Sequence, residues 1–246
     1  MNRIAFTVFG MDVAWYGLLV AAGMLFGVLL AQKRAKNEGY GEEAIFDIAI
    51  WAIPFGVLGA RIYYILFNWS YYMQDPIRML QFREGGLAIH GGIILGFLVG
   101  YYVCRKKGLP FWNMADIAAP SFILGQAIGR WGNYFNQEAY GRETDLPWAI
   151  TVNEMQVHPT FLYESVWNVL VMLFLLYYTP KKKANGEVFS LYLILYSVGR
   201  FFIEGLRTDS LMIGPFRTAQ IISIAMIVGG IIAIKVFRMQ NPRHTE

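Results

Sequence analysis

The sequence predicts an all-α integral membrane protein with seven transmembrane helices and a small extracytoplasmic cap. Hydrophobic residues make up 56% of the 246 residues, and charged residues only 15%, whereas soluble domains carry about 25% charged residues. The mean hydropathy is +0.40. The charges also gather in short clusters after apolar stretches, which is typical of polytopic membrane proteins. We find no polar linker long enough to divide the chain, so residues 1–246 are expected to form a single domain.

Seven apolar segments come close to the roughly 20 residues that a helix needs to cross the hydrocarbon core. They run over 14–31, 44–67, 86–104, 111–130, 160–178, 188–205 and 213–234. The fourth is the least apolar, because polar residues interrupt it between Asn113 and Gln126. The first is interpreted as a retained helix and not a cleaved signal peptide, because Lys33 and Arg34 follow its apolar run instead of preceding it.

The positive charges predict the orientation of the chain. Four clusters at alternate helix ends hold 12 of the 21 Lys and Arg residues, including all eight lysines. They are 33/34/36, 105/106/107, 181/182/183 and 235/238/243. The positive-inside rule places them in the cytoplasm, so the N-terminus is expected outside and the C-terminus inside a bacterial cytoplasmic membrane. The outer loops, about 68–85 and 131–159, then form the extracytoplasmic part.

The nine remaining positive residues are all arginines and lie in the outer loops or near the outer ends of helices. They are Arg3, Arg61, Arg78, Arg83, Arg130, Arg142, Arg200, Arg207 and Arg217. Arginine presents a planar fork of donors that suits phosphate, which lysine does not. An ionisable residue within a membrane helix also indicates a functional site.

Several functions are disfavoured by composition. The net charge of +4 comes without a long basic run, so no nucleic-acid partner is expected. The single cysteine, Cys104, allows no internal disulfide. The three histidines lack the spacing of metal ligands, and no phosphate-binding loop or nucleophile elbow is present, so neither a metal nor an organic cofactor is expected.

The first candidate motif is GGLAIHGG, residues 85–92, at the outer entrance of the third segment. Glycines flank His90 on both sides and would let a headgroup or a backbone approach closely. Histidine is the side chain that titrates near neutral pH. The alternative is helix packing through small residues around a core histidine.

The second candidate motif is GRWGNYFNQEAYG, residues 129–141, at the outer end of the fourth segment. An aromatic belt at the membrane interface explains its Trp and Tyr residues. It does not explain Arg130 at the end of an apolar helix, or the dense polar group of Asn133, Asn136 and Glu138.

The third candidate motif lies on the sixth segment, where four polar residues share one helix face. Tyr196, Arg200, Glu204 and Arg207 fall within about 80° of one another at 100° per residue. Arg200–Glu204 and Glu204–Arg207 have the spacings of helix ion pairs. A buried structural ion network is the alternative, but two arginines against one glutamate leave a positive excess that suits an anion.

Together these motifs resemble the prolipoprotein diacylglyceryl transferase family over nearly the whole chain. GRWGNYFNQEAYG resembles the family signature and is its most specific part, and GGLAIHGG resembles the histidine motif. HPTFLYE at 158–164 and YSVGRFFIEGLR at 196–207 resemble two further family strings, and Tyr16 matches an N-terminal tyrosine. The positions matched are Tyr16, His90, Arg130, Asn133, Asn136, Glu138, Gly141, His158, Tyr163, Glu164, Tyr196, Arg200, Glu204 and Arg207.

The resemblance implies transfer of the diacylglyceryl group of phosphatidylglycerol to the lipobox cysteine thiol of a preprolipoprotein signal peptide. A thioether forms and glycerol phosphate leaves, at a site facing the outer leaflet. His90, Arg130, Arg200 and Glu138 are the candidate catalytic residues. Tyr16, Asn133, Asn136, Gly141, Tyr196, Glu204 and Arg207 are the candidate substrate-binding residues. The alternatives are a small-anion transporter, whose polar residues should lie near the midplane, and a non-catalytic membrane subunit that binds anionic lipid.

Reporter fusions test the predicted orientation. A fusion after Lys183 should report the cytoplasm and a fusion after Arg207 the outside, because every lysine lies at the predicted inner ends. The opposite result at either position would contradict the predicted membrane topology.

Overall fold

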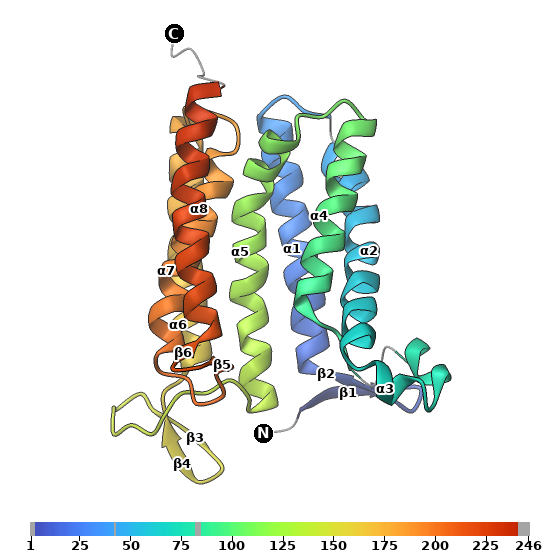
Figure 1. Ribbon diagram of the computed structural model, residues 1–246, viewed down its shortest axis with the longest axis vertical. Helices are drawn as coiled ribbons and strands as arrows, with labels where there is room; N and C mark the ends of the chain where they lie inside the picture. Colours follow the sequence, from blue (N-terminus) through green and yellow to red (C-terminus); the bar gives the residue numbers. More distant parts are fainter. Residues whose placement is uncertain (1–2, 42, 82–84, 241–246) are drawn as a thin grey trace. The chain divides into compact units, whose positions relative to one another are not determined.

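The computed structural model describes residues 3–41, 43–81 and 85–240 (Figure 1). The predicted outer arginine Arg83 and the inner arginine Arg243 lie outside these residues. The chain divides into two compact units, each described by itself. The small unit comprises residues 32–114, and the large unit comprises residues 1–31 and 115–246.

The described part of the chain is mainly helical, with seven helices of 18 residues or more and three short hairpins. The elements are β1 (Ile4–Val8), β2 (Met11–Ala14), α1 (Trp15–Asn37), α2 (Ala44–Phe67), α3 (Trp69–Tyr72), η1 (Pro76–Leu80), α4 (Ile89–Lys106), α5 (Phe111–Asn136), β3 (Ile150–Val152), β4 (Met155–Val157), α6 (Thr160–Tyr178), η3 (Thr179–Lys181), α7 (Glu187–Glu204), β5 (Met212–Ile213), β6 (Phe216–Arg217) and α8 (Thr218–Gln240). Each hairpin pairs two consecutive antiparallel strands.

Among the described residues, four helices are long and apolar enough to cross a membrane: α1, α2, Thr160–Lys181 and α8. The chain is thus an α-helical membrane protein. Helices α2 and α6 have the predicted bounds. Helix α8 begins later than predicted, because residues 212–217 form the β5–β6 hairpin around Gly214, whose φ is +58°. Helix α5 continues to Asn136, so residues 131–136, predicted as loop, are helical.

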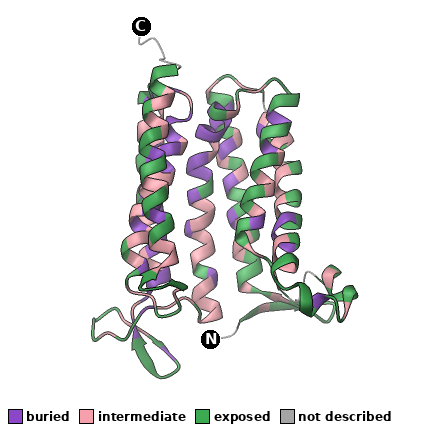
Figure 2. Ribbon diagram, viewed as in Figure 1, coloured by how far each residue is buried: buried purple, intermediate pink, exposed green. Residues whose placement is uncertain are grey.

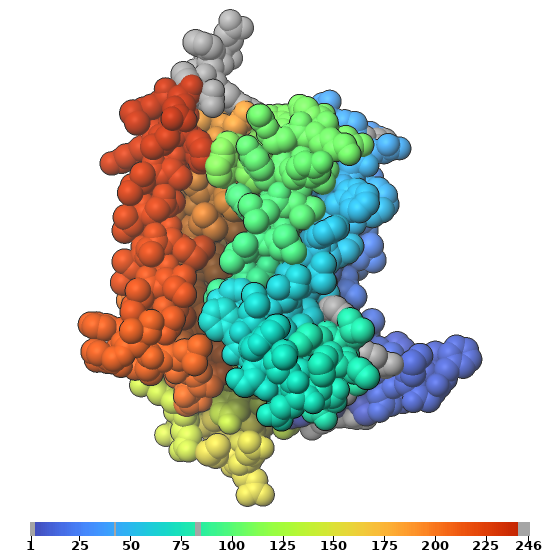
Figure 3. Space-filling view, turned by 45° about the vertical axis from the view of Figure 1, so that its right-hand side comes forward, coloured from blue at the N-terminus to red at the C-terminus, as the bar shows by residue number. Residues whose placement is uncertain are grey.

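The core of the large unit lies where α5, α6 and α7 meet. Six buried residues form it: Ala119, Ile123, Val171, Leu175, Val188 and Tyr192. Helix α8 packs on α7, where Gly230 leaves no room for a side chain beside Ile194. The rest of α8 is mainly exposed (Figures 2 and 3), which suits an apolar helix covered by lipid.

Two of the polar residues that make α5 the least apolar segment, Asp116 and Gln126, form polar contacts inside the protein. Gln126 donates a hydrogen bond of 3.0 Å to the hydroxyl of Tyr192. The buried carboxylate of Asp116 pairs with Lys182 at 3.3 Å and accepts hydrogen bonds of 2.9 Å from the backbone N–H groups of Gly186 and Phe189. These contacts tie α5 to the turn between α6 and α7, which explains why an interior helix tolerates polar residues.

The small unit is held together by a glycine seam between α2 and α4. A Cβ on Gly91 would lie 2.2 Å from the carbonyl oxygen of Gly59, and one on Gly92 would lie 3.2 Å from that of Gly56. Small residues of this kind let two membrane helices approach until their backbones touch. The packing interpretation therefore accounts for both glycines that follow His90.

Arg61 organises the outer loop of the small unit. It is only 3% exposed, and its guanidinium donates hydrogen bonds to the carbonyl oxygens of Arg78 at 2.5 Å, Met79 at 3.1 Å and Gly85 at 2.6 Å. It also lies over the ring of Tyr72. From the sequence, Arg61 was one of the nine arginines considered as candidates for phosphate binding. These contacts give it a structural role instead.

Replacing Gly91 by Ala should destabilise the protein by about 1–3 kcal/mol, because the added methyl group forces α2 and α4 apart. Reversible unfolding in mixed detergent micelles measures this. The matched control is Gly229→Ala in α8, where the added Cβ meets nothing within 4 Å. Equal stability of the two variants would contradict the proposed close packing.

Candidate active site

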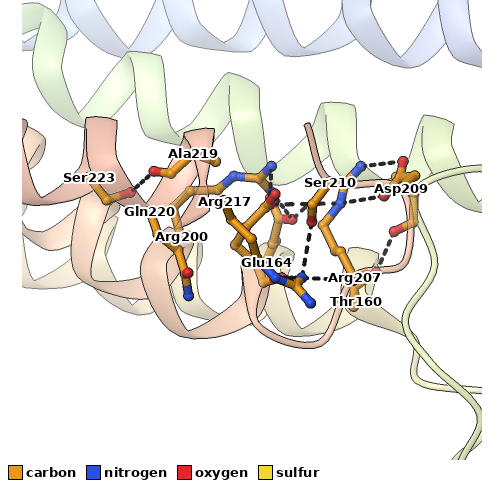
Figure 4. A network of polar contacts seen from close by, with 12 residues as sticks. Thr160, Glu164, Arg200, Arg207, Asp209, Ser210, Arg217, Ala219, Gln220 and Ser223 are labelled. Atoms are coloured by element: carbon orange, nitrogen blue, oxygen red, sulfur yellow. Dashed lines mark hydrogen bonds and ion pairs between the residues drawn. The ribbon is translucent and has the colours of Figure 1, made fainter. Parts of the chain in front are cut away.

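The centre of the candidate site is the carboxylate of Glu164 in the first turns of α6. It is 4% exposed, and three arginines converge on it, of which Figure 4 labels Arg200 and Arg207. Arg130 of α5 places Nε 2.6 Å from Oε2, and Arg200 of α7 places Nη1 2.8 Å from Oε1. Arg207 lies further away, with Nη1 3.7 Å from Oε1. One glutamate therefore connects the C-terminal part of α5, the N-terminal part of α6 and the C-terminal part of α7.

The face of α7 contains the ion pairs that the spacing predicted. Arg200 Nη2 lies 2.6 Å from Oε2 of Glu204, and Arg207 Nε lies 3.9 Å from the same oxygen. Glu204 is buried. Tyr196, one turn before Arg200, is half-buried and packs its ring beside that of Tyr192. Tyr196, Arg200 and Glu204 thus lie on α7, whereas Arg207 follows the end of the helix and forms a β-bridge with Gly141.

The segment after α7 extends the network. Asp209 binds Arg207 through two hydrogen bonds of 2.9 and 2.7 Å. Burial raises the pKa of Asp209, but the hydrogen bond and charge of Arg207 outweigh it, so the pKa lies below its usual range. Arg217 donates hydrogen bonds to the carbonyl oxygens of Glu204 and Arg207 and to Ser210, which holds the segment against the end of α7.

The arginines outnumber the carboxylates in this network. Arg130, Arg200 and Arg207 pair with three acids, which are Glu164, Glu204 and Asp209, and Arg217 binds backbone carbonyl oxygens beside them. An arginine has five N–H donors, and the described residues engage one of them in Arg130 and two in Arg200. The network therefore retains one positive charge in excess and unused donors on both arginines, which together suit a bound anion.

The polar residues of the second motif form a smaller cluster at the end of α5. Asn133 and Asn136 both donate their amide N–H to Oε1 of Glu138, at 3.0 and 3.2 Å. Gln137 and Ala139, on either side of Glu138, have positive φ values of 54° and 58°, a conformation that non-glycine residues rarely adopt. Two amides and an unusual backbone thus fix an exposed carboxylate.

Gly141 brings the end of this motif against α6 and α7. It forms a β-bridge with Arg207, and its N–H donates to the carbonyl oxygen of His158 at 3.0 Å. A Cβ here would lie 2.6 Å from that of His158 and 3.2 Å from the carbonyl oxygen of Leu206. Glycine is therefore required by close approach of backbone, not by an unusual φ.

Tyr16, at the start of α1, packs against the signature. Its Cδ2 would lie 2.6 Å from a Cβ on Gly132, so glycine makes room for the tyrosine ring. The neighbouring Trp15 stacks on Phe135 with ring centroids 4.9 Å apart. The large unit thus brings together all predicted site residues except His90.

His90 belongs to the small unit, at the beginning of α4. It is exposed, and its ring lies 6.0 Å from that of Tyr63. Gly91 and Gly92 are explained by the α2–α4 seam, whereas Gly85 has a φ of +86° and open space around it. His90 is therefore not a satisfied core histidine, and its imidazole remains accessible.

Three residues of the charged network were not among the site residues chosen from sequence: Glu164, Asp209 and Arg217. Glu164 was visible only as the last residue of HPTFLYE, and its importance comes from three arginines distant in sequence. Asp209 had a detectable signal, since it lies two residues from Arg207. No feature of the sequence indicated the backbone contacts of Arg217.

The apolar helices and the half-buried arginines that pair with Glu164 and Glu204 define a helical membrane protein with an arginine-rich polar site. The family model for prolipoprotein diacylglyceryl transferase matches residues 3–236. The chain is 54% identical over 233 residues to a phosphatidylglycerol–prolipoprotein diacylglyceryl transferase of Clostridioides difficile (strain 630), covering 95% of this chain and 94% of that protein.

Proteins with the same name from Finegoldia magna and Clostridium novyi (strain NT) are 51% and 47% identical. The first match covers 100% of both chains and the second 98% of both. The chain belongs to the prolipoprotein diacylglyceryl transferase family and is a transferase.

Replacing Glu164 by Gln should lower the free energy of unfolding by about 3 kcal/mol or more, because three arginines lose the buried charge that they share. Unfolding in mixed micelles measures this. Glu143→Gln, at an exposed position of the same unit, should have little effect and is the control. If Glu164→Gln proved as stable as the parent, Glu164 would not connect the three helices.

Proposed function

We propose that this protein transfers the diacylglyceryl group of phosphatidylglycerol to the lipobox cysteine thiol of preprolipoprotein signal peptides. The observation that carries the proposal is the arginine excess around Glu164 in a member of this transferase family. The relatives from C. difficile and F. magna are named for phosphatidylglycerol and prolipoprotein. An anionic phospholipid is a substrate that a buried arginine network suits.

The reaction has two physical requirements. The cysteine thiol must lose its proton, because thiolate is the nucleophile and an ordinary thiol has a pKa of about 8.5. The thiolate sulfur then forms a bond to the glyceryl carbon, and the carbon–oxygen bond to phosphate breaks. The oxygen keeps the electron pair and leaves as glycerol phosphate, so negative charge grows on the phosphate as the bond breaks.

Arg130 and Arg200 are proposed to bind the phosphate and to stabilise the departing glycerol phosphate. Each retains N–H donors that Glu164 and Glu204 do not use. The two carboxylates fix the guanidinium groups before the lipid binds, so no reorganisation is needed as charge develops. Arg207 adds positive charge from the end of α7.

His90 is proposed to take the thiol proton or to orient the thiol, since its imidazole is accessible and unperturbed imidazole titrates near pH 6.5. Glu138 is the rival base, and its two amide donors would position it for that role. Tyr16, Asn133, Asn136, Gly141, Tyr196 and Glu204 complete the proposed substrate-binding residues.

The proposed setting is the bacterial cytoplasmic membrane, with a site that faces the outer leaflet. Residues 1–246 would form one domain with seven membrane-spanning helices, the N-terminus outside and the C-terminus in the cytoplasm. The outer loops, about 68–85 and 131–159, would form the extracytoplasmic cap. The support is the placement of all eight lysines in clusters at alternate helix ends.

The test of the function is labelling of a lipobox peptide by the purified protein with phosphatidylglycerol as donor. The expected product carries a diacylglyceryl thioether on cysteine, and a peptide with Ser in place of that cysteine stays unlabelled. A transporter or a non-catalytic lipid-binding subunit would produce no thioether, so absence of product with a folded protein would refute the proposal.

Arg130→Lys and Arg200→Lys should each insert normally but lose about a hundredfold or more in rate, since lysine cannot reproduce a bidentate fork on phosphate. Initial rates of thioether formation measure this. A network that merely holds helices together should partly tolerate Lys. Retention of most activity by either variant would remove that arginine from the phosphate site.

His90→Gln should lower the rate and change its pH dependence, because the amide of Gln cannot accept the thiol proton. A pH–rate profile of thioether formation measures both. The same measurement on the companion variant Glu138→Gln tests whether Glu138, the rival base, takes the proton instead. An unchanged rate and profile in His90→Gln would exclude His90 from proton transfer.

A further inference from the structure

A second lipid-binding feature lies on the large unit, where α6 and α7 enclose an apolar groove of about 540 Å³. Leu162, Val166 and Leu170 line it from α6, and Val198 and Phe202 line it from α7. The groove follows the helix pair over more than two turns. Its dimensions and lining suit a single hydrocarbon chain.

The groove faces away from the arginine network. Leu162 and Val166 each lie two positions from Glu164, which is about 160° around the helix. On α7, Val198 and Phe202 have the same relation to Arg200. A chain bound in the groove therefore points mainly away from the proposed phosphate site, although Trp167 and Ile203 lie only about 60° around their helices from Glu164 and Arg200.

The wall of the groove is fixed in shape. Trp167 lines it and donates a hydrogen bond of 2.9 Å from its indole N–H to the carbonyl oxygen of Leu195. Its ring fills the space above Gly199, where a Cβ would lie 2.2 Å from the indole. A preformed apolar surface of this kind binds a chain without first being ordered.

The outer end of the groove carries polar groups. Tyr163 lines the groove, and its hydroxyl accepts a hydrogen bond of 2.8 Å from the indole N–H of Trp148. The hydroxyl lies 3.2 Å from Nδ1 of His158 and can direct its own proton there. Nε2 of His158 then carries the other ring proton as a free donor.

Arg142 lies at the same end of the helix pair. Its N–H donates to the carbonyl oxygen of Leu206 just after α7, and its carbonyl oxygen accepts from the N–H of His158 just before α6. Its side chain is exposed and has no ion-pair or hydrogen-bond partner among residues 3–41, 43–81 and 85–240. The groove thus borders the imidazole of His158 through Tyr163, and Arg142 is joined to His158 through its backbone.

We propose that this groove binds one acyl chain of an anionic phospholipid whose phosphate contacts Arg142 and His158, and that this lipid is not the one that reacts. The charge at the outer end selects an anionic headgroup. The separation from Arg130 and Arg200 makes the site distinct from the proposed reaction site. The bound lipid would cover the α6–α7 seam beside Glu164 and Glu204.

The test uses phosphatidylglycerol and phosphatidylcholine that carry a diazirine in one acyl chain, with crosslinked peptides identified by mass spectrometry. In the parent protein, the phosphatidylglycerol probe should label 162–170 and 198–203. Val166→Phe fills the groove and should reduce this labelling about tenfold, because excluding a few methylene groups weakens binding by that factor. Leu170→Trp fills it from a second position.

The matched control is Val228→Phe in α8, since Val166 and Val228 are 51% and 50% exposed and only Val166 lines the groove. It should keep full labelling. Arg142→Gln should reduce labelling by phosphatidylglycerol to the level of phosphatidylcholine. Arg130→Lys should leave groove labelling intact, even where it removes transfer.

Three outcomes would overturn the proposal. Undiminished labelling in both filled variants would show that no chain occupies the groove. Equal labelling of the parent protein by the two probes would show that the headgroup charge is not recognised. Loss of groove labelling in Arg130→Lys would show that the groove holds the tails of the reacting lipid instead.

Discussion

The sharing of one buried carboxylate by three arginines is the interaction on which the packing of α5, α6 and α7 at the candidate site depends. A charge taken out of water is costly unless a partner neutralises it at hydrogen-bonding distance. Glu164 meets this condition with Arg130 and Arg200 at 2.6 and 2.8 Å. Because these residues come from α5, α6 and α7, neutralising the charges also fixes three helices relative to one another.

The same arrangement would allow one network to fulfil both a structural role and the proposed catalytic role. An arginine that is fully engaged by carboxylates cannot bind a substrate, and an arginine without any partner is mobile and costly to bury. Arg130 and Arg200 lie between these extremes, since each is held through part of its guanidinium group. The excess of arginine over acid keeps the network attractive to an anion.

Much of the helical framework could be predicted, because membrane helices are encoded locally by length and hydropathy. The bounds of α2 and α6 were correct. The extension of α5 to Asn136 was not predicted, because the last residues of the helix are polar and aromatic, which is typical of a loop at the membrane interface. In the site, the pairing of Arg200 with Glu204 follows from helix periodicity.

What the sequence could not predict depends on contacts between distant segments. Nothing local marks Glu164 as the residue on which three arginines converge. The glycines beside His90 could serve either a ligand or a helix, and only the position of Gly59 opposite Gly91 decides for the helix. Likewise Arg61 resembled the other outer arginines until its loop carbonyl partners were known.

Arg61 also has a consequence for biogenesis. During synthesis α2 enters the bilayer as a single apolar segment, and an arginine within it opposes insertion by about 2.5–3.5 kcal/mol when it lies at the helix centre. The carbonyl groups that satisfy this guanidinium come from residues 78–86, which leave the ribosome after α2. We therefore expect these contacts, which form once the following residues fold back, to stabilise α2 in the bilayer after it has inserted.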